Sequence, residues 1–174
     1  YGVTLIDHDP EQVELMRRFG FRTYYGDAAR RDVLEAAGIE EAKLLVLAFD
    51  DPERVHETAL LVRERFPHVQ LIARARGRTE ALELAGHGIP FERETFRAAA
   101  AVGGRALVAL GEHPHDAHRA QQAFVQHDQH MLREAVAARG DDPALISLAE
   151  RARADLARLL KREGLPDAED GDGE

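Results

Sequence analysis

Short apolar runs alternate with amphipathic stretches over the first half of the chain. The apolar runs predict β-strands at residues 3–6, 21–25, 44–49, 69–73 and 89–92. Between them, apolar positions at helical spacing predict helices, among them one that starts at Pro10 and one over residues 52–66. Strands and helices that alternate in this way form right-handed crossovers and a parallel sheet. The pattern therefore predicts an α/β fold with helices on both faces of the sheet.

Aspartate–proline pairs and glycines mark the expected helix ends. Asp9 and Asp51 each precede a proline, which places a capping carboxylate before a residue that suits the first helical turn. Gly38 is placed to end the second helix. The strand at 44–49 is apolar throughout, so we expect helices to cover both of its faces.

From Thr95 onward the pattern changes to helices alone. The last helix starts at Asp142–Pro143, and its apolar residues recur at alternating spacings of four and three, as in a packed or self-associating helix. These residues are Leu145, Ala149, Ala152, Leu156 and Leu159. We expect a Rossmann-like domain at 1–94, a helical dimerisation and regulatory extension at 95–164, and a disordered acidic tail at 165–174.

Composition narrows the class of protein. The 174 residues include 32 acidic and 23 basic side chains, a net charge of −9 that would repel a phosphate backbone, so we expect no nucleic-acid partner. The longest clearly apolar run, at 44–49, is far shorter than the roughly 20 residues of a membrane-spanning helix. The absence of cysteine excludes disulfides and thiol chemistry.

Acidic residues follow three successive predicted strands: Asp7, Asp27 and Asp50. In parallel α/β sheets, ligands bind beyond the carboxyl ends of the strands, so we expect these side chains to contact an adenosine group. Asp7 stands where dinucleotide-binding folds place the carboxylate that accepts ribose hydroxyls. Taken alone, such an acid is better explained as a solvated turn residue, and the acids after the next two strands are what favour the ligand.

The glycine-rich G-x-G-x-x-G turn that normally lies about 20 residues before such an acid is missing. The first residue is Tyr1, so we expect the chain to begin inside a Rossmann-like unit, without its first strand and phosphate-binding loop. Contacts to a pyrophosphate are therefore not assigned to any residue.

Arg74 and Arg76 alternate with alanine, so both side chains leave the predicted strand on one face. Neighbouring guanidiniums repel each other unless an anion or carboxylates lie between them. Two interpretations remain open: an anionic ligand, or ion pairs with the nearby glutamates at 80, 83, 92 and 94.

Other candidate chemistry is weak. Two histidine groups have the three-residue spacing of helix-borne metal ligands, but Pro114 interrupts the first and no cysteine accompanies them, so we expect no metal. These are His113, His115 and His118, and His127 with His130. Ser147 is the only serine and there is no G-x-S-x-G motif, so we expect no catalytic residues and no enzymatic activity.

Several segments together resemble the nucleotide-binding regulatory domain of potassium channels and transporters, the RCK or KTN domain. They are LIDHDPEQVELMRRFGFRTYYGDAARRDVLEAAGI, AFDDPERV, FPHVQLIARARGR and ERETF. More narrowly, IARARGR, ETFRAAAAVGGRALVALGEHPHDAHRAQ and QHMLREA are similar to the cytosolic end of the B-type Kef glutathione-regulated potassium efflux antiporter. The similarity extends to about Arg153.

The resemblance implies a regulatory domain on the cytoplasmic face of the bacterial inner membrane, with the antiporter's membrane segment upstream in the same polypeptide. The implied cofactor is an adenine nucleotide, NAD(H) or AMP, and the implied effector is glutathione or its adducts. The implied partners are a second copy, forming a homodimer, and a flavodoxin-like ancillary subunit. The resemblance places Asp7 and Asp27 at the adenosine, and Arg74 and Arg76 at an anionic regulatory ligand near the dimer interface.

Two other functions remain open: a fragment of an NAD-dependent oxidoreductase, and a soluble nucleotide-binding subunit of another potassium transporter. The helical C-terminal part offers no convincing acid–base group, which argues against the oxidoreductase.

Overall fold

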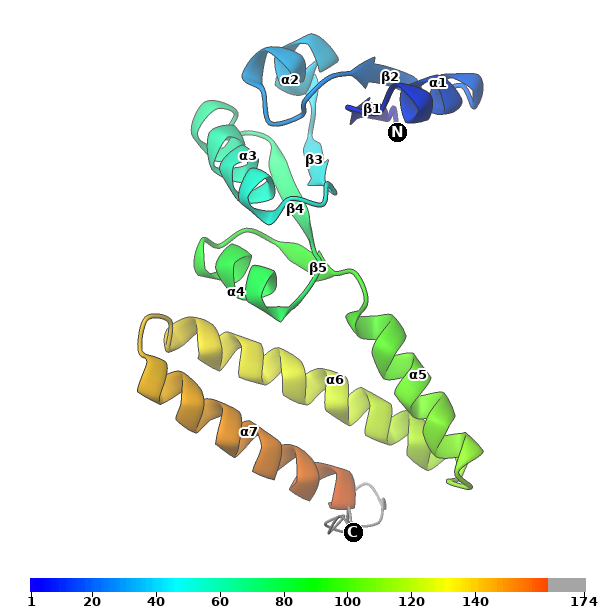
Figure 1. Cartoon of the computed structure of the whole chain (residues 1–174), viewed down its shortest axis with the longest axis vertical. Helices are drawn as coiled ribbons and strands as arrows, with labels where there is room; N and C mark the ends of the chain where they lie inside the picture. Colours follow the sequence, from blue (N-terminus) through cyan, green and yellow to red (C-terminus); the bar gives the residue numbers. More distant parts are fainter. Residues whose placement is uncertain (163–174) are drawn as a thin grey trace. The chain divides into compact units, whose positions relative to one another are not determined.

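The elements follow one another in the predicted order, with one additional α-helix, α4, and a short 3-10 turn. The computed structural model describes residues 1–162 (Figure 1). In chain order the elements are β1 (Thr4–Asp7), α1 (Pro10–Arg18), β2 (Arg22–Tyr25), α2 (Arg31–Ala37), the 3-10 turn η1 (Ile39–Glu41), β3 (Leu44–Leu47), α3 (Pro52–Arg65), β4 (Gln70–Ala75), α4 (Arg78–Gly86), β5 (Phe91–Arg93), α5 (Phe96–Ala109), α6 (Pro114–Ala137) and α7 (Asp142–Arg162).

These elements form two compact units, which we describe one at a time. The first comprises Tyr1–Ala75 and Gly88–Glu92, and the second comprises Arg76–His87 and the described residues from Arg93 onward. The acidic tail expected at 165–174 lies outside the described residues. None of the helices in residues 1–162 combines the length and the apolar character that crossing a membrane requires.

The strands β1 to β4 pair in parallel, but the strands form two sheets where the sequence predicted one. β1 pairs with β2 from Thr4–Arg22 to Asp7–Tyr25, and β3 pairs with β4 from Leu44–Gln70 to Leu47–Ala73. β5 is hydrogen-bonded on the far side of β4. The predicted class, parallel strands with helices and a helical C-terminal part, is confirmed.

One prediction about β3 is wrong. Leu47 of β3 is buried, as are Val55 and Val62 of α3, the helix that packs against the neighbouring strand β4. On the opposite face Leu44, Val46 and the neighbouring Ile72 of β4 keep 46%, 57% and 41% of their surfaces exposed. An apolar run shows that a strand avoids water, but it does not supply the second layer, and no described element covers this face.

The predicted caps are present. The Asp9 Oδ1 atom accepts a hydrogen bond from the Glu11 backbone N–H at 2.8 Å. The Asp51 Oδ1 atom accepts from the backbone N–H groups of Glu53 and Arg54, at 3.0 and 3.3 Å. Both carboxylates satisfy amides that the first helical turn leaves without a partner, so these two acids serve the helices α1 and α3.

Gly38 ends α2 in the left-handed region, with φ +90° and ψ 35°. A Cβ atom at this position would contact nothing within 4 Å, so the cost of Gly38→Ala is conformational. We expect a loss of about 1 kcal/mol in the free energy of unfolding, measured by urea denaturation.

Gly103 is the matched control for that substitution. It is exposed within α5, and a Cβ atom there also contacts nothing within 4 Å. Because alanine favours a helix over glycine, Gly103→Ala should gain about 0.5–1 kcal/mol. Changes of the same sign at both positions would contradict this account.

The second unit is helical, and α6 packs against α4, α5 and α7. Met131 and Ala135 of α6 form a buried cluster with Leu148 of α7, against which Leu145 and Ala152 pack. The seam predicted through Ala149 is therefore wrong in one position, because Ala149 is exposed and Leu148 is buried. Residues 145, 148 and 152 recur at spacings of three and four, so they share one face of α7, and this face packs against α6.

Candidate functional site

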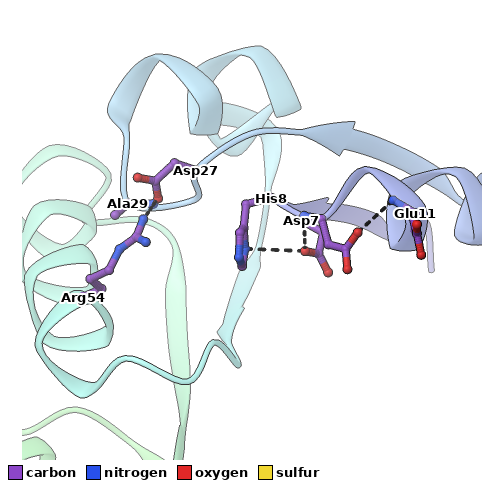
Figure 2. A network of polar contacts seen from close by, with 7 residues as sticks. Asp7, His8, Glu11, Asp27, Ala29 and Arg54 are labelled. Carbon is purple, nitrogen blue, oxygen red and sulfur yellow. Dashed lines mark hydrogen bonds and ion pairs between the residues drawn. The ribbon is translucent and has the colours of Figure 1, made fainter.

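Asp7 lies at the end of β1, as the sequence predicted, with its side chain half-buried. Its Oδ1 atom accepts a hydrogen bond from the Asp9 backbone N–H at 2.9 Å and lies 3.6 Å from His8 Nδ1 (Figure 2). Its Oδ2 atom accepts no hydrogen bond from residues 1–162. The turn therefore fixes one carboxylate oxygen and leaves the other available to a donor.

Asp27 has the same geometry at the end of β2. Its Oδ1 atom accepts from the Ala29 backbone N–H at 2.9 Å and from Arg54 Nη2 of α3, while Oδ2 has no partner among the described residues (Figure 2). The Gly26 N–H donates to the Asp7 carbonyl at 2.9 Å, which ties the two strand ends together. Parallel pairing thus brings Asp7 and Asp27 to one edge of the β1–β2 sheet.

A hollow of about 410 Å³ opens at this edge. Its lining residues are His8, Tyr25, Gly26, Asp27, Arg30, Asp32 and Val33. The Arg30 guanidinium donates to both carboxylate oxygens of Asp32, at 3.0 and 2.6 Å. That hydrogen bonding lowers the pKa of Asp32 and raises the pKa of Arg30, so both line the hollow as charged groups.

Asp50, the third predicted site residue, lies after β3 in an exposed position. Its Oδ1 atom accepts from Arg74 Nη2 of β4 at 2.5 Å, so a partner of Arg74 is an acid that the sequence had assigned to the ligand. The backbone N–H of Arg76 donates to the buried Glu80 at 2.7 Å. The structure therefore pairs Asp7 with Asp27 at one edge and Asp50 with Arg74 elsewhere in the first unit.

Sequence reasoning missed Arg54. Its guanidinium contacts a carboxylate 27 residues earlier in the chain, so no local spacing announces the pair. The only signal is its place in the first turn of the helix that Asp51 caps, beside the end of a predicted strand.

A second missed cluster lies in the second unit. Asp128 of α6 accepts from Arg78 of α4 at 2.7 Å and from Arg93 of β5. The side chains of Asp128 and Arg93 are only 15% and 10% exposed. The Arg93 guanidinium lies 3.6 Å from the centroid of the Phe96 ring, which stacks on Phe124 at 5.8 Å.

The predicted histidine groups have structural contacts. His113 Nδ1 accepts from the His115 N–H at 3.2 Å and caps α6, and His127 Nε2 lies 2.9 Å from the Ala152 carbonyl of α7. Over residues 1–162, histidine and carboxylate side chains do not gather in groups of three or more suited to a metal ion.

Each of the two parts of the chain, before and after Thr95, matches a known protein family. The TrkA-N domain family matches residues 1–91, and the potassium efflux system KefB C-terminal domain family matches residues 98–173.

Two solved structures are similar. A Kef C-terminal domain from Shewanella denitrificans in AMP-bound form is 39% identical, with a TM-score of 0.72, covering 79% of this chain and 84% of that one. The TrkA-N domain of the Escherichia coli inner membrane protein ybaL is 24% identical, with a TM-score of 0.52, covering 63% of this chain and 78% of that one, and shares the fold. The chain therefore belongs to the TrkA-N (RCK/KTN) family, in the branch that forms the C-terminal domain of Kef-type potassium efflux systems.

Proposed function

We propose that this chain is the regulatory part of a glutathione-gated potassium/proton antiporter. It binds an adenine nucleotide at the carboxyl ends of β1 and β2. The observation that carries the proposal is the matched geometry of Asp7 and Asp27. Each has one oxygen held by a backbone N–H and a second oxygen without a partner among residues 1–162. Ionised carboxylates in this state accept hydroxyl or amino donors, and a ribose or adenine supplies both.

The carboxylate of Asp7 also indicates which nucleotide fits. An acid at the end of this strand accepts the ribose 2′-hydroxyl and repels a 2′-phosphate, so AMP or NAD(H) is favoured over NADP(H). The AMP in the Shewanella denitrificans relative supports an adenine nucleotide.

Binding of the nucleotide's phosphate groups requires a segment in addition to β1–β5. The outer edges of β1 and β3 pair with no described strand, and the apolar face of Leu44, Val46 and Ile72 is open. We infer that an additional parallel strand with a glycine-rich loop completes the sheet and binds the phosphates. A polypeptide that includes it should bind nucleotide more tightly than residues 1–174 alone.

Regulation is proposed to involve a second copy of the chain. Val102 and Val108 of α5 and Leu110 just after it have exposed apolar side chains that suit a homodimer contact. An ancillary flavodoxin-like subunit would bind the dimer. Glutathione or its adducts would bind near Arg74 and Arg76, at the cytoplasmic face of the bacterial inner membrane. Gating requires the effector to bind two arrangements of the dimer with different affinities.

Nuclear magnetic resonance titration of the isotope-labelled chain with AMP tests the nucleotide proposal and tolerates weak binding. We expect amide shifts concentrated around Asp7 and residues 25–29, and a smaller response to NADP than to NAD. No shifts at millimolar AMP, or shifts confined to α5–α7, would contradict the proposal. Parallel titration with glutathione should perturb residues 74–76.

A further inference from the structure

Two independent contacts hold Arg54 beside the proposed nucleotide site at the carboxyl ends of β1 and β2. Its backbone N–H donates to the capping carboxylate of Asp51 at 3.3 Å, which fixes it in the first turn of α3. Its side chain extends from α3 to the loop after β2, where Nη2 donates to Asp27 Oδ1 (Figure 2). Arg54 and Asp27 are both half-buried, so water screens the pair less than it would screen a fully exposed one.

The two carboxylate oxygens of Asp27 differ in their hydrogen bonds. Oδ1 accepts from both Ala29 and Arg54, whereas Oδ2 points away from the guanidinium in Figure 2 and accepts from no residue in 1–162. A carboxylate fixed through one oxygen cannot rotate freely, and a carboxylate oxygen without a proton only accepts hydrogen bonds, so Oδ2 is placed to meet a donor.

We propose that Arg54 is a positioning residue of the nucleotide site, which orients Asp27 so that Oδ2 meets a hydroxyl or amino donor of the ligand. This inference rests on the proposed nucleotide binding and adds a residue to it. The contacts at the site agree, since the Arg30 guanidinium hydrogen-bonds to Asp32, whereas the Arg54 guanidinium hydrogen-bonds to Asp27.

A double-mutant cycle in AMP affinity tests the inference, using the titration described above on the wild type, R54Q, D27N and the double variant. We expect R54Q to weaken AMP binding about 10-fold, the effect of losing a charge-assisted contact, and R54K to recover most of that loss. In the D27N background, R54Q should change the AMP affinity less than about twofold, because the side chain at position 27, which Arg54 positions, has lost its charge. The matched control is R18Q in α1, whose exposed Arg18 pairs with Glu14 and should leave AMP binding unchanged.

The outcomes separate the two proposals. If the wild type binds AMP and R54Q binds it equally well, the positioning role is wrong and nucleotide binding stands. If R54Q weakens binding as much in D27N as in the wild type, Arg54 acts on the ligand directly and the inference is also wrong. If the wild type shows no response to AMP, both proposals fail. Should R54Q unfold, which circular dichroism would show, R54M and D27N/R54M replace R54Q and its double variant, and an equal loss of AMP affinity in the two backgrounds would overturn the inference.

Discussion

Replacing Asp128 by alanine is expected to destabilise the second unit by about 3–5 kcal/mol, the typical cost of removing one partner from a buried ion pair. Arg93, only 10% exposed, would keep its charge and its place over the Phe96 ring without the carboxylate that balances it. Arg78 of α4 would lose its contact with Asp128 as well, so both arginines that this carboxylate binds within the second unit would lose it. Urea unfolding followed by circular dichroism measures the loss.

Two variants make this prediction specific. Asp116 is also on α6, but it is more exposed and lies 3.5 Å from Arg119, so Asp116→Ala should cost no more than about 1 kcal/mol. Asp128→Asn keeps the shape and an acceptor oxygen and should fall between the two. Equal losses in Asp116→Ala and Asp128→Ala would show that Asp128 behaves as an ordinary surface acid.

Helix ends could be predicted from sequence because their causes are local. Asp9 and Asp51 bond to amides two or three residues away, and Gly38 needs only its own backbone conformation. The additional helix α4 was not predicted, because its apolar residues, Ala81, Leu82, Leu84 and Ala85, surround the helix without leaving a polar stripe to reveal the period.

Positions of site residues could be predicted, but their partners could not. Asp7 and Asp27 end successive parallel strands, and topology alone brings such ends to one edge. The pairs Asp27–Arg54 and Asp50–Arg74 join residues that are 27 and 24 positions apart. In a chain with 23 basic and 32 acidic residues, charge pattern offers many equivalent partners, and only the packing of α3 and β4 selects among them.

The sequence did not predict which face of an apolar element is covered by a neighbouring element. The apolar run at 44–49 correctly predicted a strand, yet Leu44 and Val46 are exposed. Hydrophobicity measures the tendency of a side chain to leave water, and the element that covers it belongs to another part of the sequence. The same reasoning applies to α7, where the choice of Leu148 over Ala149 depends on the direction of α6.

Asp7→Asn is expected to weaken AMP binding about 10- to 100-fold, the effect of losing hydrogen bonds to a charged group worth about 1.5–3 kcal/mol. Asparagine still accepts through its side-chain oxygen and supports the same turn, so the Asp9 N–H keeps its partner and the fold is retained. What is lost is the negative charge that strengthens bonds to ribose hydroxyls and repels a 2′-phosphate. The preference for NAD over NADP should therefore shrink along with the affinity, and competition titration measures both.

Asp9→Asn is the matched control, since it removes the same charge only two residues away. Asparagine caps helices as well as aspartate does, so the Glu11 N–H stays satisfied and α1 stays intact. If nucleotide affinity depended on the general negative potential of this loop, both variants would weaken binding alike. If it depends on a carboxylate oxygen aimed at the ligand, Asp7→Asn alone will do so, because the Asp9 carboxylate is committed to its helix.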